Sequence, residues 1–194
     1  MKIIIVSGPI GSGKSKVSEL FKSKGFAYIN SDLLAKKIIK NNIQIQKKIK
    51  RFLGLNVFIK KKLSIAKLKK YIFLSKYNKD KIDSIIHPYF FKELNSMIKN
   101  TKKDKLVIEI PLIETCKNIK YKYKIISVIS KIHKRIERLN KKNKKSIEYF
   151  NIINNFQRKP GFYIKNSDYI MMNNGTMSEL KQKFNNIYKK INYE

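Results

Sequence analysis

The first thirty residues restrict the possible folds more than any other part of the chain. Residues 2–6 (Lys-Ile-Ile-Ile-Val) form an apolar run that ends just before Gly8, which is typical of a strand buried on both faces of a sheet. From Lys14 onward, apolar residues follow helical spacing as far as Gly25, a residue type that commonly ends helices. A second short strand is expected over residues 26–29. A strand, a glycine-rich turn, a helix and a strand form a βαβ unit, and this unit predicts a parallel sheet.

The turn between this first strand and helix carries a phosphate-binding motif. Residues 8–15 (Gly-Pro-Ile-Gly-Ser-Gly-Lys-Ser) match G-x-x-x-x-G-K-[ST] at every fixed position. Its glycines let backbone N–H groups turn toward phosphate oxygens, its lysine can reach the β- and γ-phosphates, and its last serine can bind Mg²⁺. The alternative is an ordinary glycine-rich turn. We predict an ATP phosphate site made by Gly11, Ser12, Gly13, Lys14 and Ser15, with Lys14 catalytic.

The remaining strand patterns lie in the second half of the chain. Apolar runs over residues 106–110, 124–129 and 169–172 predict three more strands, with helical patterns between them. A final helix is expected from about Ser178. We therefore expect an α/β protein with a parallel five-stranded sheet between two layers of helices, a three-layer α/β/α fold.

Residues 32–100 show no convincing strand, and they predict a helical insert between the second and third strands. Ser64 and Asn78 are each expected to cap the N-terminus of the helix that follows them. Pro88 restricts the residue before it to an extended conformation, so we expect a helix to end at His87.

The net charge is high, but it does not by itself identify a partner. The chain has 45 Lys and Arg against 13 Asp and Glu, a formal charge of +32. Only four of the basic residues are arginines, whereas the chain holds 41 lysines, 33 isoleucines and 19 asparagines. Proteins that read nucleic acid use arginine heavily for bidentate contacts. This composition favours a general bias toward A/T-rich codons, and nucleic-acid binding is expected to be non-specific at most.

Cysteine content and hydropathy exclude two further classes of protein. A single cysteine, Cys116, allows no internal disulfide. No apolar stretch approaches the ~18 residues of a membrane helix, and the apolar run at the N-terminus is too short for a signal peptide. We expect a cytoplasmic protein that does not enter a membrane.

Asp32 is the first acidic residue after the second predicted strand. Ligands of doubly wound sheets bind at the carboxyl ends of the strands, so Asp32 is expected at the same edge as the phosphate motif. A carboxylate there can accept the proton of an acceptor hydroxyl or help to bind Mg²⁺. The alternative is that Asp32 caps the helix that follows.

Several motifs together resemble the dephospho-CoA kinase family over about residues 2–190. The motifs are Gly8–Ser15, Asn30-Ser31-Asp32-Leu33-Leu34-Ala35, His87-Pro88, Pro111-Leu112-Ile113-Glu114, Arg138 with Lys142, Gln157, Asp168 and Asn173-Asn174-Gly175. The resemblance implies a P-loop kinase that uses ATP and Mg²⁺ to phosphorylate the ribose 3′-hydroxyl of dephospho-CoA, the last step of coenzyme A synthesis. It also implies one kinase domain with a core (about 1–31, 104–133 and 162–194), a substrate-binding insert (32–103) and a helical lid (134–161).

The family pattern is not followed everywhere. The family usually has Asp-x-Asp after the second strand, whereas this chain has Asn30 in the first of these positions. The lid resembles a pair of arginines four residues apart, but the second is Lys142, which keeps the charge and loses the bidentate fork. The resemblance therefore implies Asp32 as base and metal ligand and Arg138 as the catalytic lid residue, with Arg135 as its competitor.

The resemblance also implies roles for residues outside the phosphate motif. His87 and Pro111 would contact the acceptor, Lys142 would bind ATP, and Asn174 would lie in a turn near adenine. His87-Pro88 could equally be a helix-ending turn, and the lid cations could be a solvated lysine-rich face. Asp168 could tie down the last strand, and Glu109 or Glu114 could support Mg²⁺ through water.

Two other functions remain open at this point. One is a kinase of the same fold that acts on another small molecule, such as a nucleoside monophosphate. The other is a nucleic-acid-binding protein that uses ATP only as a switch, which would show a steep salt dependence. The oligomeric state is also open.

Overall fold

The computed structural model describes residues 1–143 and 147–193, without the side chains of residues 142 and 143. It consists of two compact units, one formed by Met1–Asn30 with Thr101–Glu194 and the other by Ser31–Asn100. Within the described ranges, every helix is too short or too polar to span a bilayer.

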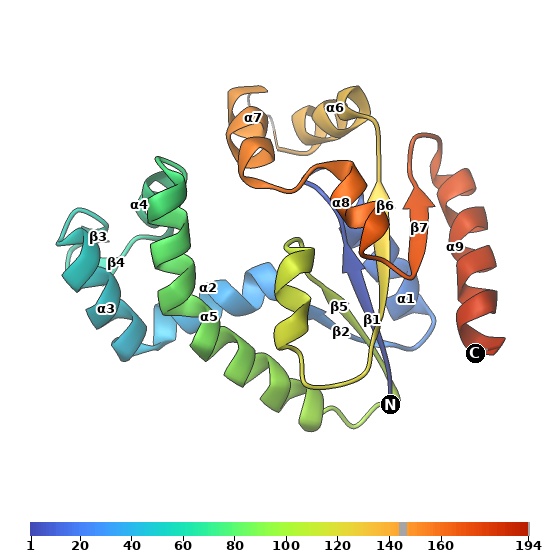
Figure 1. The fold of residues 1–194 in the computed structure, drawn as a ribbon, viewed down its shortest axis with the longest axis horizontal. Coiled ribbons are helices and arrows are strands. Elements are labelled where there is room, and N and C mark those ends of the chain that lie inside the picture. Colours follow the sequence, from blue (N-terminus) through green and yellow to red (C-terminus); the bar gives the residue numbers. More distant parts are fainter. Residues whose placement is uncertain (144–146, 194) are drawn as a thin grey trace. The chain divides into compact units, whose positions relative to one another are not determined.

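The first unit is built on a five-stranded parallel sheet (Figure 1). The strands are β1 (Lys2–Ser7), β2 (Ala27–Asn30), β5 (Lys105–Glu109), β6 (Lys124–Ile129) and β7 (Tyr169–Met172). Their order is β2-β5-β1-β6-β7, and every neighbouring pair is parallel. This confirms the sheet predicted from the apolar runs.

Helices cover both faces of this sheet. On one face, α1 (Lys14–Ser23) and α9 (Met177–Tyr193) pack against the strands, and the ring of Phe21 lies 5.0 Å from that of Phe26 and 4.8 Å from that of Phe184. On the other face lie a 3-10 helix, η1 (Ile113–Asn118), and α8 (Pro160–Lys165), which packs on β6. The three-layer fold is therefore confirmed.

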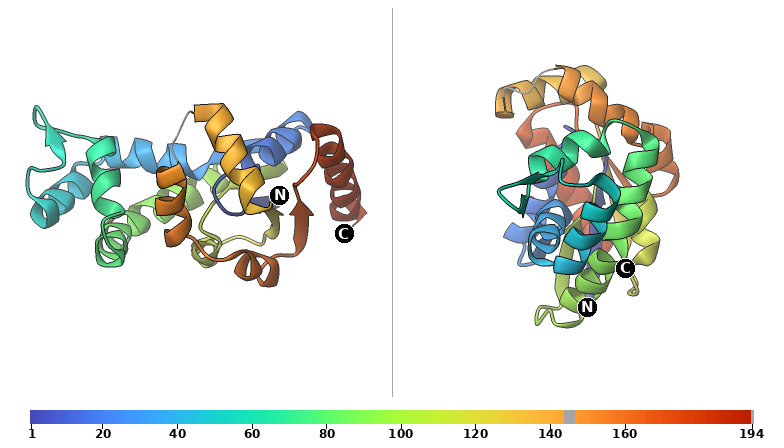
Figure 2. Two further views of the ribbon diagram at one scale, coloured as in Figure 1. Left: turned by 90° about the horizontal axis from the view of Figure 1, so that it is seen from above. Right: turned by 90° about the vertical axis from the view of Figure 1, so that its left-hand side faces the viewer.

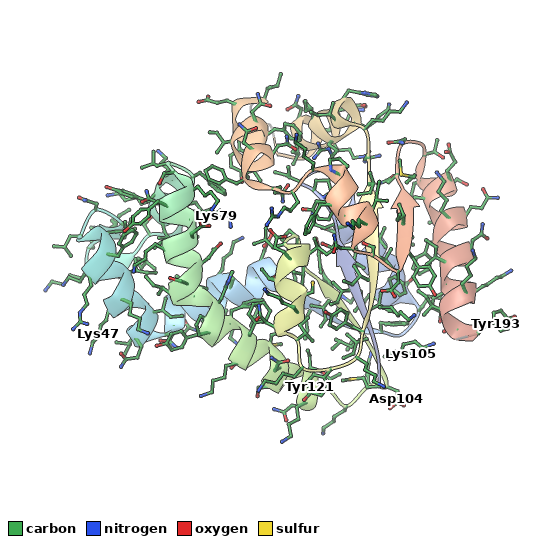
Figure 3. The ribbon with its side chains drawn as sticks, viewed as in Figure 1. Lys47, Lys79, Asp104, Lys105, Tyr121 and Tyr193 are labelled. Carbon is green, nitrogen blue, oxygen red and sulfur yellow. The ribbon has the colours of Figure 1, made fainter. Side chains whose placement is uncertain are left out.

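Two more helices, α6 (Ile132–Asn143) and α7 (Ile147–Phe156), lie beyond the carboxyl ends of β6 and β7 (Figures 1 and 2). Asp104 and Lys105, labelled in Figure 3, mark the opposite edge of the sheet, where β5 begins. The carboxyl edge is where a doubly wound sheet binds its ligand. The helices α6 and α7 therefore stand at the ligand-binding edge of the first unit.

The second unit is mainly helical. It contains α2 (Ser31–Asn41), α3 (Ile43–Leu53), α4 (Ile65–Ile72), α5 (Lys76–Lys99) and a short hairpin of β3 (Phe58–Ile59) and β4 (Lys62–Leu63). The hairpin lies beside α3 and α4 (Figures 1 and 2). Our expectation of no strand here was wrong, because the hairpin turns at Lys60 and Lys61, which take positive φ without the Asn-Gly pair that usually announces such a turn.

The caps of these helices agree with the sequence in one case and differ in the other. Ser64 caps α4, and its Oγ accepts a hydrogen bond of 3.3 Å from the backbone N–H of Lys67. Asn78 was wrongly predicted as a cap. Ser75 caps α5 instead, with its Oγ accepting from the N–H of Asn78 at 3.0 Å, and the Asn78 side chain donates back to the carbonyl of Tyr71. Two polar residues three positions apart both suited the role, and the earlier one begins the helix.

The helix expected to end at His87 continues through Pro88 to Lys99. A proline inside a helix removes one N–H and costs about 3 kcal/mol. Buried residues on both sides of Pro88 offset this cost, because α5 presents Ile82, Ile86, Phe90 and Leu94 to the core of its unit. Burying a large apolar side chain contributes about 1.5–3 kcal/mol, so several outweigh one proline.

Candidate active site

The phosphate motif forms a tight loop between β1 and α1. Gly11 and Gly13 have φ of 76° and 103°, and Gly13 is the N-cap of α1 without any side-chain cap. A Cβ built on Gly11 would lie 2.6 Å from the carbonyl oxygen of Arg135, and one built on Gly13 would lie 2.2 Å from Nδ2 of Asn173. Only glycine fits these positions. The loop therefore has the uncapped helix N-terminus that favours an anion.

Arg138 and Asn173 hold this loop from outside. The buried Asn173 donates from Nδ2 to the carbonyl of Ser12 at 2.8 Å. Arg138 donates from Nη1 to the carbonyls of Ser12 and Gly11 at 3.4 and 3.5 Å, and from Nη2 to the carbonyl of Asn173 at 2.8 Å. Burial lowers the pKa of Arg138, yet the guanidinium stays charged at neutral pH. The loop carbonyls are thus bonded before any nucleotide is present.

Arg135 has a different environment from Arg138. Its side chain is only 4% exposed, and its guanidinium carbon lies 5.1 Å from the ring centroid of Phe150 on α7. Its Nη1 donates to Oδ1 of Asn154 at 3.0 Å and to the carbonyl of Ile10 at 3.4 Å. Gln157 completes this support, since its Oε1 accepts from the N–H of Ile10 at 2.7 Å. These contacts make Arg135 a packing residue between the loop and α7.

Ser15 points toward a buried acid at the end of β5. Its Oγ donates to Oε1 of Glu109 at 2.9 Å, and Glu109 is 7% exposed. The other oxygen of Glu109, Oε2, accepts from the hydroxyl of Tyr28 at 2.7 Å. Asn30 in turn donates from Nδ2 to the Tyr28 hydroxyl oxygen at 3.0 Å. Burial raises the pKa of Tyr28 to about 12, so this phenol is protonated at neutral pH.

This arrangement fits a magnesium ion. A serine hydroxyl has one proton and two lone pairs, and the proton of Ser15 is donated to Glu109. Its lone pairs are then directed away from Glu109, as a hard cation with oxygen ligands requires. Among residues 1–143 and 147–193, no group of three or more His, Cys, Asp or Glu residues could hold a metal by itself. Mg²⁺ would therefore take most of its ligands from phosphate and water.

The other predicted residues of the first unit make structural contacts. Lys14 lies over its own loop, and its Nζ donates to the carbonyl of Pro9 at 3.1 Å. Oδ1 of Asn174 accepts from the N–H of Lys131 at 2.8 Å, which links the turn after β7 to the start of α6. The carbonyl of Pro111 accepts from the hydroxyl of Tyr163 at 3.1 Å.

The acidic residues outside this cluster are tied to the sheet or to α8. Asp168 accepts from the N–H of Ile125 at 2.7 Å, which supports the role of tying down the last strand. Glu114 pairs with Nε of Arg158 at 3.3 Å and so is engaged elsewhere. Of the two acids considered as supports for Mg²⁺ through water, Glu109 is the one that contacts Ser15.

Two predicted residues belong to the second unit. Asp32 is exposed in the first turn of α2. Because α2 begins at Ser31, Asp32 lies inside the helix, and the alternative role as its cap is wrong. His87 lies within α5, with its ring 5.8 Å from that of Phe91 and Nε2 at 3.8 Å from Oδ1 of Asp83. The side chain of Lys142 lies outside what the structure describes.

Sequence reasoning placed Asn173 in the turn after the last strand without a contact to the phosphate loop, and it missed Tyr28 as part of the site. Asn173 directly follows β7, so its place at the carboxyl edge could have indicated it. Tyr28 precedes Asn30 by two residues on β2, and side chains two apart on a strand share a face. Its partner Glu109 is 81 residues away, and only the register between β2 and β5 reveals the contact.

A five-stranded parallel sheet with this loop and a serine–acid pair beside it defines an ATP-dependent P-loop kinase. A family model described as dephospho-CoA kinase matches residues 2–179. The chain therefore belongs to the dephospho-CoA kinase family, which confirms the resemblance seen in the sequence and the predicted enzyme class.

Relatives of known sequence and structure agree with this assignment. The chain is 31% identical to a dephospho-CoA kinase of Fusobacterium nucleatum over 186 residues, which cover 93% of this chain and 94% of that protein. An alignment with the dephospho-CoA kinase of Buchnera aphidicola, at 29% identity, spans 65% of this chain and 58% of that protein. The solved dephospho-CoA kinase from Campylobacter jejuni is 27% identical with a TM-score of 0.69, covering 98% of each chain.

Proposed function

We propose that this chain transfers the γ-phosphoryl group of ATP to the ribose 3′-hydroxyl of dephospho-CoA. The observation that carries the proposal is the preformed phosphate loop, with Ser15 hydrogen-bonded to a buried acid, in a chain of the dephospho-CoA kinase family. Phosphoryl transfer has a loose transition state, so catalysis comes mainly from position and electrostatics.

The residues of the first unit would bind and orient ATP. The amides of the loop and the ammonium of Lys14 bind the β- and γ-phosphates, where negative charge must be stabilised. Ser15 would hold Mg²⁺ through its hydroxyl oxygen, while the hydroxyl donates a hydrogen bond to Glu109. When bound, this cation neutralises charge on the phosphates.

Arg138 has two roles in this proposal. It braces the loop through the carbonyls of Gly11 and Ser12. It also places a permanent positive charge next to the loop, where it stabilises the transferring phosphoryl group. Lys142 adds a second positive charge on α6 for the nucleotide, and Asn174 keeps the turn after β7 in place beside the base.

Asp32 is the proposed general base. Its carboxylate is exposed and it follows the carboxyl end of β2 by two residues. It would accept the proton of the acceptor 3′-hydroxyl as the new P–O bond forms, and it would support Mg²⁺. His87 and Pro111 would contact dephospho-CoA.

A comparison of acceptors tests the proposed reaction. ATP consumption is measured with dephospho-CoA, AMP, CMP and shikimate under identical conditions, and the product is identified by mass. We expect dephospho-CoA to give the highest kcat/KM. Preference for any other acceptor would overturn the proposal and favour another small-molecule kinase of this fold.

A further inference from the structure

Four side chains of the first unit form a continuous chain of hydrogen bonds. It runs from Asn30 to Tyr28 at 3.0 Å, from Tyr28 to Glu109 at 2.7 Å, and from Ser15 to Glu109 at 2.9 Å. The register between β2 and β5 places Asn30 opposite Glu109, and Tyr28 and Asn30 lie on the same face of β2. Both oxygens of the buried carboxylate are thus bonded, one by each neighbour.

The proton positions in this series of hydrogen bonds follow from Glu109 accepting at both of its oxygens. A tyrosine hydroxyl has a single proton, and here it is donated to Glu109. The hydroxyl oxygen can then only accept, and the amide nitrogen of Asn30 supplies a donor. An aspartate at position 30 would supply no donor, and its oxygen would face the hydroxyl oxygen of Tyr28.

We propose that Tyr28 and Asn30 are a matched pair of positioning residues that fixes Glu109, so that Glu109 holds the Ser15 hydroxyl with its lone pairs turned toward Mg²⁺. This proposal rests on the proposed function only in that the site binds a magnesium nucleotide, and it does not depend on which acceptor is used. Tyr28 and Asn30 touch neither metal nor substrate in this account. They act through the orientation of Glu109.

Tyr28 and Asn30 can influence the binding of Mg²⁺ because Glu109, which they hold, is buried. Glu109 is only 7% exposed, so its carboxyl oxygens need hydrogen-bond partners within the protein, and the carboxyl group has one from each side. If the donor from Tyr28 is lost, Oε2 of Glu109 is left without this partner, and the carboxylate can turn away from Ser15. The Ser15 hydroxyl is then no longer held in one orientation, and this weakens the binding of Mg²⁺ more than that of the nucleotide alone.

Nucleotide binding with and without metal measures this effect directly. The affinity for a fluorescent ADP analogue is determined in EDTA and in saturating Mg²⁺, and the ratio of the two affinities is the magnesium coupling. For Tyr28→Phe, which keeps the ring, we expect an unchanged affinity in EDTA and a coupling lowered by about tenfold, the scale of one hydrogen bond to a charged group. Tyr188→Phe is the matched control, because Tyr188 packs among aromatic rings between α1 and α9.

The second arm tests whether the two residues are matched. Asn30→Asp is expected to lower the magnesium coupling at least as much as Tyr28→Phe does. In the double variant Tyr28→Phe/Asn30→Asp the phenol is gone, so the aspartate no longer faces its oxygen, and the coupling should exceed that of Asn30→Asp alone.

Each outcome decides the question. An unchanged coupling in Tyr28→Phe with a native circular dichroism spectrum would overturn the proposal. An equal loss of affinity in EDTA and in Mg²⁺ would also overturn it, since the hydroxyl would then support the loop rather than the metal. If Tyr28→Phe does not fold, the Asn30→Asp variant is measured, and a parental coupling there overturns the matched pair. Because no acceptor is present, failure of the proposed reaction would leave these measurements unaffected.

Discussion

At the scale of single residues, Lys14 and Asp32 divide the proposed chemistry between charge stabilisation and proton transfer. Lys14 lies in the loop at the start of α1, and Asp32 lies exposed in the first turn of α2. Neither side chain belongs to a hydrophobic core. Substitutions at both positions should therefore change turnover much more than stability.

Lys14→Ala is expected to lower kcat by about 10²-fold or more, because the ammonium acts most strongly on charge that develops in the transition state. The fold should be retained, as a circular dichroism spectrum would show. Steady-state kinetics with saturating ATP measure the loss. Parental turnover in this variant would remove Lys14 from the mechanism.

Asp32→Asn removes basicity and charge while it keeps the size of the side chain. General-base assistance contributes about 10²–10⁴-fold, and we expect a loss of kcat in that range with little change in melting temperature. Asp80→Asn, which changes an exposed carboxylate that pairs with Lys76 on α5, serves as the control. If Asp32→Asn keeps most of the parental kcat, the base must be a different residue.

At the scale of elements, α6 presents two arginines whose roles differ according to what they contact. Arg138 donates hydrogen bonds to the carbonyls of the phosphate loop and of Asn173, whereas Arg135 packs against the ring of Phe150 on α7. Arg138→Ala should lower kcat more than it weakens the binding of ATP without acceptor. Arg135→Ala should lower kcat less but cost about 2–4 kcal/mol in the free energy of unfolding, since it breaks buried hydrogen bonds and packing.

Urea unfolding and single-turnover kinetics on the two variants separate these effects. A larger loss of turnover at Arg135 than at Arg138 would mean that the wrong arginine has been assigned. Full turnover in both variants would mean that this face of α6 has no part in the reaction.

The sequence allowed the sheet and the loop to be predicted because both are local patterns. A buried parallel strand is a short apolar run, and the phosphate motif occupies eight consecutive residues. Pro88 was misjudged because its effect on α5 is decided by the burial of Ile86 and Phe90, which depends on packing rather than on local preference. The β3–β4 hairpin was missed because its turn uses two lysines.

In the candidate site too, residues of a local motif could be predicted, whereas contacts between distant residues could not. Lys14 and Ser15 follow from the motif, whereas the contacts of Ser15 with Glu109 and of Arg138 with Asn173 join residues 94 and 35 positions apart. Such contacts depend on how α1 and α6 pack beside the carboxyl ends of β5 and β7. A single sequence shows which residues stand at strand ends, but it does not show which of them meet.

At the scale of the whole molecule, charge and burial decide how the protein unfolds. With a net charge of +32, the excess lysine and arginine side chains repel one another in the compact state. An anionic nucleotide relieves part of that repulsion. A ligand that binds only the native state stabilises it. The nucleotide should therefore protect regions that open only when the first unit unfolds.

Cys116 reports such opening. It is 1% exposed in η1, and burial, with Glu114 as a further cause, raises the pKa of its thiol to about 12 from 9.0. The native state thus favours the protonated thiol, and this contribution to stability is complete below pH 9.0 and is lost as pH rises toward about 12.

We expect thiol reagents to label native Cys116 slowly at pH 8 and the urea-unfolded chain rapidly, with ATP slowing the native reaction further. Raising the pH toward 9 should speed labelling of the unfolded chain because its thiolate fraction grows. The rate is measured by mass spectrometry. Fast labelling of the native protein would show that η1 opens without global unfolding.

The hydrogen bond between Asn30 and Tyr28 also limits the order in which these two positions can change over evolutionary time. An acid at position 30 is tolerated better once position 28 has lost its hydroxyl, because the carboxylate oxygen would otherwise face the hydroxyl oxygen of Tyr28 with no proton between them. Two single substitutions separate the pair Tyr28 and Asn30 from the pair of phenylalanine at position 28 and aspartate at position 30. If position 28 changes first, the hydrogen-bond donor to Glu109 is lost. If position 30 changes first, the new carboxylate is repelled by the hydroxyl oxygen of Tyr28. Positions 28 and 30 are therefore expected to covary among related chains, with tyrosine beside asparagine and an aliphatic or phenyl side chain beside aspartate.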